Sequence, residues 1–184
     1  MKSKYKLLFC ILFISFLGSG CGTAYKAVVD ERNIRTQAQD EKIEMAIRKK
    51  IADSDRVKFF DISTYCFYGN VYLVGEYDTS SQKSEAVKLA KKVEGVRSVT
   101  EYFLQKKKGD LCGTGDNLGI VAKVKAKLIK DKAIWSTNVK VKGVQCNIVL
   151  LGLVGSQNEI NKAVLHARSV PGVRKVKSFL KATK

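Results

Sequence analysis

The sequence lacks any apolar run long enough to cross a membrane. The longest, residues 7–17, holds eleven apolar or small side chains, whereas a transmembrane helix needs ~20. Residues that serve catalysis are also scarce. There is one histidine among 184 residues, and the five cysteines are dispersed. This spacing excludes the usual zinc sites, and no Ser, Cys or Lys stands in a nucleophile motif. We therefore expect no enzyme, no metal site and no cofactor.

Intrinsic disorder is excluded by composition, because 45% of the residues are hydrophobic. The N-terminus instead has the layout of a secretory signal peptide over residues 1–20. Three lysines come before the apolar run, and small residues at 18–20 come before Cys21. We therefore expect an exported chain.

The segment from Leu17 to Cys21 resembles a bacterial lipobox, in which the cysteine becomes the lipidated first residue. Leu17 stands one position further upstream than usual. The resemblance implies that Cys21 is acylated and that residues 21–37 form a lipidated tether. Gly22 follows, rather than the Asp that retains many lipoproteins in the inner membrane, so we expect the outer membrane. An ordinary signal peptide with an incidental cysteine is the alternative.

Export would leave three cysteines, Cys66, Cys112 and Cys146, in an oxidising compartment. Three is an odd number, so at most one disulfide forms within the chain and at least one thiol remains. Cys66 and Cys146 lie in apolar, strand-like stretches and also fit a hydrophobic core. The pairing stays open at this point.

The remainder of the chain is an internal repeat of one unit. A shift of 77 residues aligns residues 43–104 with 120–181 without a gap, and 13 positions are identical. We therefore predict a first domain over residues 38–108, a linker over 109–115 and a second domain over 116–184.

Each copy predicts the element order α-β-β-α-β. Ile43, Ile47 and Ile51 recur at helical spacing, as do their counterparts in the second copy. Gly95 and Gly172 are expected to end the second helix of each copy. The predicted strands are residues 60–67, 71–77, 96–105, 139–144, 148–154 and 173–180. The fold class is α+β, with a small mixed sheet and two helices on one face in each copy.

Residues 69–75 and 93–99 resemble the two signature stretches of the BON domain, and residues 147–152 and 170–176 repeat them. With the lipobox, the tandem copies resemble the dual-BON-domain outer-membrane lipoproteins of Gram-negative bacteria. The resemblance implies a lipid-anchored protein on the periplasmic face that binds phospholipid and supports envelope integrity. Cys146 stands where the first copy has Gly69, so we expect the second hairpin turn to differ.

Charge is divided unevenly between the copies. Residues 38–108 hold 14 basic and 11 acidic side chains, whereas residues 116–184 hold 14 basic and only 3 acidic ones. Such a basic domain usually indicates a nucleic-acid partner, but export removes nucleic acid from reach. Anionic phospholipid headgroups are the alternative, at about 1 kcal/mol for each Lys or Arg near the surface.

The first helix of the second copy offers a candidate lipid-binding face. Its residues are basic side chains at helical spacing with a tryptophan beyond them: Lys123, Lys125, Lys127, Lys130, Lys132 and Trp135. Trp135 fits equally well in the domain core or in the contact between copies, and lysines on a helix are often only a solvated face. The competing interpretation is a structural or adaptor protein that binds an envelope protein or a cell-wall polymer.

Overall fold

A computed structural model describes residues 32–183. The predicted signal peptide and the predicted lipidation site Cys21 lie outside these residues. The first copy contains α3 (Ile34–Ala52), η1 (Phe59–Asp61), β1 (Ile62–Phe67), β2 (Asn70–Tyr77), α4 (Ser80–Lys91) and β3 (Ser98–Gln105). The second contains α5 (Thr114–Lys130), η2 (Ser136–Asn138), β4 (Lys140–Val144), β5 (Asn147–Val154), α6 (Gln157–Arg168) and β6 (Lys175–Ala182).

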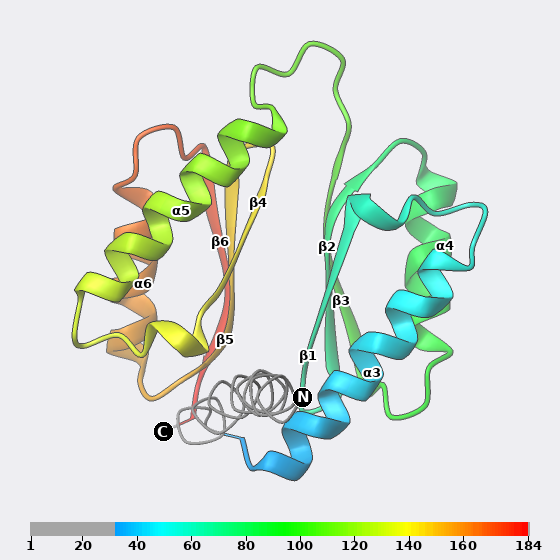
Figure 1. The fold of residues 1–184 in the computed structure, drawn as a ribbon, viewed down its shortest axis with the longest axis horizontal. Helices are drawn as coiled ribbons and strands as arrows, with labels where there is room; N and C mark the ends of the chain where they lie inside the picture. The colour runs from blue at the N-terminus through cyan, green and yellow to red at the C-terminus, as the bar shows by residue number, and fades with distance from the viewer. Residues whose placement is uncertain (1–31, 184) are drawn as a thin grey trace, which may run out of the picture.

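Each copy folds into a three-stranded mixed sheet. The spatial orders are β1-β2-β3 and β4-β5-β6. The first two strands of each sheet are antiparallel, and the third is parallel to the second. Two helices cover the outer face of each sheet (Figure 1). The predicted α+β class and the mixed sheet are therefore confirmed.

The internal repeat is followed closely by the backbone. Strands β2 and β5, helices α4 and α6, and strands β3 and β6 are each displaced by 77 residues at both ends. The predicted helix-ending glycines, Gly95 and Gly172, adopt positive φ angles of 85° and 92°. Helix α3 begins at Ile34, within the stretch predicted as a tether.

Two expectations were wrong in detail. Phe60 does not begin the first strand, because residues 59–61 form a short 3-10 helix that leaves its ring 93% exposed. The second hairpin turn does not differ from the first. Gln145 and Cys146 have φ angles of 48° and 57°, and the turn before β2 has two positive φ angles as well. Cys146 can hold this conformation because other contacts fix it, as described below.

Gly75 and Gly152 occupy positions where no side chain fits. A Cβ atom on Gly75 would lie 1.9 Å from the carbonyl oxygen of Asp61, and one on Gly152 would lie 1.9 Å from that of Asn138. In both copies the short 3-10 segment before the first strand ends against this glycine. The close backbone approach explains why the two copies share it.

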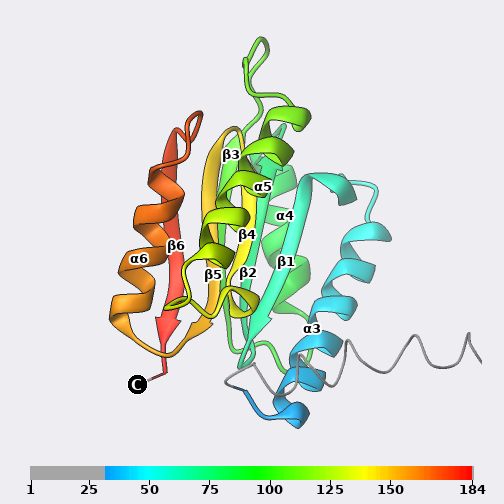
Figure 2. The same cartoon turned by 60° about the vertical axis from the view of Figure 1, so that its left-hand side comes forward.

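The two sheets pack against each other face to face (Figures 1 and 2). Their contact is a third apolar cluster, separate from the core between sheet and helices in each copy: Phe67, Tyr72, Val74, Val144, Val149, Leu151 and Leu153. The rings of Tyr72 and Phe179 lie 5.3 Å apart across it. The inner strand β5 is consequently buried on both faces, with all eight residues buried.

Candidate membrane-binding face

Helix α5 is fixed by its cap and its core stripe. The Asp116 carboxylate accepts a hydrogen bond of 2.9 Å from the backbone N–H of Gly113, just before the helix. Ile120, Val124 and Leu128 are buried, as the spacing predicted. The opposite side of the helix faces solvent, and this is where most of the candidate residues lie.

The candidate lysines do not form one uniform stripe. Lys123, Lys125, Lys130 and Lys132 are exposed. Lys127 is half-buried on the flank toward α6, where its ammonium donates a hydrogen bond of 2.8 Å to Ser169 Oγ. Lys125 lies on the other flank and lines a hollow together with Tyr65 of the first copy. The basic side chains therefore flank a central exposed strip.

Apolar side chains accompany these lysines at the end of the helix. Trp135 is 56% exposed, so it fills neither the domain core nor the contact between copies. Its position is nevertheless fixed, because its neighbour Ile134 is buried and its own backbone N–H donates to Glu159 Oε1 at 2.7 Å. Ile129, on the last turn of α5, is 68% exposed. We call the surface formed by these residues the basic–aromatic face: Lys123, Lys125, Lys127, Ile129, Lys130, Lys132 and Trp135.

Sequence reasoning missed the contribution of Ile129. The signal was present, because Ile129 falls outside the buried stripe of residues 120, 124 and 128 and so points away from the core. Leu118 and Leu165 are also exposed apolar residues on α5 and α6. An apolar side chain among lysines on an exposed helix face is typical of surfaces that enter a lipid headgroup layer.

Both acidic groups that contact this face are already engaged, and Glu159 accepts hydrogen bonds from the backbone N–H groups of Trp135 and Gly155. The Asp131 carboxylate contacts His166 Nε2 at 2.9 Å and lies 3.9 Å from the ammonium of Lys162. The hydrogen bond from His166 lowers the pKa of Asp131 below its usual value. The histidine thus ties α6 to the end of α5, and its partner does not oppose the exposed lysines.

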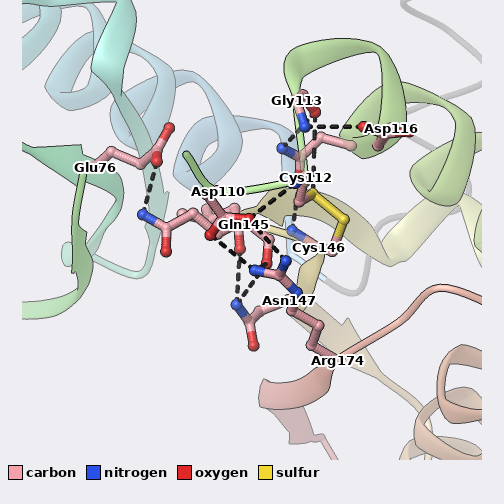
Figure 3. Close-up of a disulfide and its surroundings, with 11 residues drawn as sticks. Glu76, Asp110, Cys112, Gly113, Asp116, Gln145, Cys146, Asn147 and Arg174 are labelled. Carbon is pink, nitrogen blue, oxygen red and sulfur yellow. Dashed lines mark hydrogen bonds and ion pairs between the residues drawn. A yellow bond between two sulfur atoms is a disulfide. The ribbon is translucent and has the colours of Figure 1, made fainter. Parts of the chain in front are cut away.

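A disulfide fixes the other end of α5 (Figure 3). Cys112, in the linker, is bonded to Cys146 in the turn between β4 and β5, while Cys66 is buried and free. The Asp110 carboxylate forms two hydrogen bonds to the Arg174 guanidinium, at 2.7 and 2.8 Å. This pair holds the pKa of Asp110 at about 2. The start of α5 is therefore clamped to its own sheet.

The described residues contain no group of three or more side chains suited to binding a metal ion. Within the same range, none of the helices is both long and apolar enough to span a bilayer.

Comparison with known proteins places both copies in one family. The BON domain model matches residues 39–105 and 116–184. The chain is 35% identical over 144 residues to Osmotically-inducible protein Y of Escherichia coli, which covers 77% of this chain and 72% of that protein. It is 30% identical over 158 residues to Outer membrane lipoprotein DolP of Haemophilus influenzae, which covers 85% and 81%. A 21 kDa hemolysin of Actinobacillus pleuropneumoniae is 30% identical over 152 residues, which covers 80% and 76%.

Proposed function

The chain belongs to the BON-domain family, and from that premise we propose that it is a lipoprotein that binds anionic phospholipid and supports envelope integrity. It would sit on the periplasmic face of the outer membrane, anchored through acylated Cys21. A relative that is 30% identical is named an outer membrane lipoprotein, which supports this placement. The activity would be binding and not catalysis.

The observation that carries the proposal is the basic–aromatic face. Exposed lysines attract anionic headgroups, each by about 1 kcal/mol near the surface. Trp135 and Ile129 supply apolar area beside them, which a surface evolved only for solubility would not require. The corresponding helix α3 of the first copy also exposes basic side chains and Met45, but it exposes the acidic Glu41 as well and carries no tryptophan.

The anchor and the face would act together. A lipobox cysteine carries a diacylglycerol and an amide-linked acyl chain, and two or more acyl chains hold a protein to a membrane stably. The proposed protein would therefore be tethered at Cys21 and would also place the second copy against the bilayer.

Vesicle co-sedimentation tests the proposal. The protein tested would lack residues 1–21, so that neither the predicted signal peptide nor an acyl chain contributes. Both copies are required because residues 116–184 alone would expose the apolar contact between the sheets. We expect binding to anionic vesicles at physiological salt and little binding to zwitterionic ones. Lys123→Glu combined with Lys130→Glu, or Trp135→Ala alone, should weaken binding about tenfold or more.

Lys91→Glu combined with Lys92→Glu is the matched control. Both residues are exposed in the first copy and change the net charge equally. An equal loss of vesicle binding in both double variants would show that binding depends on net charge and not on the basic–aromatic face. Unchanged sedimentation of the Lys123 and Trp135 variants would favour the adaptor interpretation, with a protein or cell-wall partner.

A further inference from the structure

The first strand of each sheet, β1 or β4, lies at an edge of that sheet. The register of its hairpin determines which of its backbone N–H and C=O groups point away from the sheet. Val144 and Asn147 pair across a two-residue turn, as Phe67 and Asn70 do. In such hairpins the closing pair is hydrogen-bonded, and pairing alternates along the ladder. The N–H and C=O of Gly143 and Val141 therefore point away from β5. By the same rule, those of Cys66 and Thr64 point away from β2.

In the first copy, side chains close this edge. The Glu44 carboxylate accepts a hydrogen bond of 2.6 Å from the Cys66 N–H, and the Arg32 guanidinium donates one of 3.1 Å to the Cys66 carbonyl. A charged residue that caps an edge strand prevents another strand from pairing there.

The second copy has lost this closure. The 77-residue shift places Val121 at the position of Glu44, Gly109 at that of Arg32 and Gly143 at that of Cys66. Neither Val121 nor Gly109 has a polar side chain. Among the described residues, no group hydrogen-bonds the outward N–H of Val141 or Gly143.

A groove follows this open edge. Two adjoining hollows, with volumes of about 400 and 440 Å³, share Val141 and together extend from Val139 to Val144. One wall is α5, through Leu118, Val121 and Ile129; the other is the first copy, through Phe60 and Tyr65. Figure 1 shows β4 between α5 and β1.

We infer that the free edge of β4 binds an extended acidic peptide segment, which adds to the second sheet as a fourth strand. Main-chain hydrogen bonds to Val141 and Gly143 would provide affinity, and the two apolar walls would receive alternate side chains. Phe60 and Leu118, 93% and 67% exposed, would be covered by the guest strand.

Charge selects an acidic guest over a basic one. Lys125, Lys140 and Lys142 line the groove. Its two carboxylates are already engaged, since Asp61 binds Lys106 at 2.5 Å and Glu76 accepts a hydrogen bond from Gln145. Side chains of Asp or Glu in the guest would therefore meet the ammonium groups of Lys125 and Lys142.

The test uses the full chain and a fluorescein-labelled nonapeptide that alternates Val and Glu. We expect binding by fluorescence anisotropy and slower amide hydrogen exchange at Val141 and Gly143. The same peptide with every backbone amide methylated should not bind, because neither of its edges can then pair with β4. Failure of the unmodified peptide to bind, or equal binding of the methylated one, would overturn the inference.

Val121→Gln restores the closure of the first copy without adding charge, because the amide oxygen can accept the Gly143 N–H as Glu44 accepts that of Cys66. We expect it to weaken peptide binding about tenfold, and more than Val121→Ala does, because Val121→Ala shortens the apolar wall but leaves the Gly143 N–H open. Both variants keep the lysines and Trp135, so anionic vesicle binding should persist in each. Equal peptide affinity in the two variants would contradict strand addition, and vesicle binding reports separately on the proposed function.

Discussion

Asp40 and Glu44 bring two carboxyl groups to the end of β1, and they have different surroundings. Asp40 is buried and accepts hydrogen bonds of 2.8 Å from the N–H groups of both Tyr68 and Gly69. It also accepts one of 3.2 Å from the Cys66 thiol. Burial, reinforced by Asp40, raises the pKa of that thiol, so Cys66 stays protonated and is a poor nucleophile. Glu44 receives a single hydrogen bond, and burial raises its pKa from 4.5 to about 7.

This shift predicts a pH-dependent stability at one residue. Because the folded state holds its proton more tightly than the unfolded state, Glu44 contributes fully below pH ~4.5, and the contribution is lost as pH rises toward about 7. The loss is at most ~3 kcal/mol. Glu44→Gln keeps an acceptor for the Cys66 N–H and cannot ionise. The stability difference between variant and wild type, from urea denaturation, should therefore move in favour of the variant between pH 4.5 and 7. A difference that is constant with pH would contradict the raised pKa.

At the scale of elements, the two copies use different means to fix the same turn. In the first copy Asp40 binds the turn between β1 and β2. In the second copy Asn117 takes the place of Asp40 and accepts a 3.0 Å hydrogen bond from the Cys146 N–H. The Cys112–Cys146 disulfide then joins that turn to the linker. A covalent bond and a neutral amide thus replace a buried carboxylate.

Replacing the disulfide should lower the free energy of unfolding. The two cysteines are separated by 34 residues, for which restriction of the unfolded chain contributes about 3–4 kcal/mol. We expect Cys112→Ser combined with Cys146→Ser to lose about 2–4 kcal/mol in urea denaturation. Reduction of the wild type should reproduce this loss and should leave the double variant unchanged. A wild type indifferent to reductant would show that the bond does not stabilise the fold.

The repeat made the elements predictable, because apolar positions 77 residues apart must serve the same core. The repeat did not predict which cysteines pair, since Cys112 lies in a linker that has no counterpart in the periodic pattern. The exposure of Trp135 could not be predicted either, because it depends on Ile134 occupying the core in place of the tryptophan. The open edge of β4 could not be predicted, because the strand registers are needed to identify which backbone groups point outward. Only with those registers does the replacement of Glu44 by Val121 indicate an unpaired edge.

At the scale of the whole molecule, the two copies form one sandwich through their sheets. The contact buries Val149 and Leu151 completely, to the same degree as residues of the individual cores. The Gln145 side chain reinforces it by donating to Glu76 Oε1 at 2.9 Å and to the Gln105 carbonyl at 2.8 Å. Because the linked copies share this apolar contact, we expect them to unfold in one cooperative transition.

Two adjacent leucines on β5 separate the contribution of the contact from that of the core. Leu151 faces the other sheet and Leu150 faces the helices of its own copy, and both are fully buried. Either Leu→Ala change should cost about 2–5 kcal/mol. Leu151→Ala also weakens the coupling, so its calorimetric enthalpy should exceed its van 't Hoff enthalpy, which reports that the copies unfold separately. Leu150→Ala should lower the transition temperature while the two enthalpies stay equal. Equal enthalpies in both variants would show that the Leu151 contact does not couple the copies. A wild type whose calorimetric enthalpy already exceeds its van 't Hoff enthalpy would show that the copies fold independently, and the groove along β4 would then lack a fixed second wall.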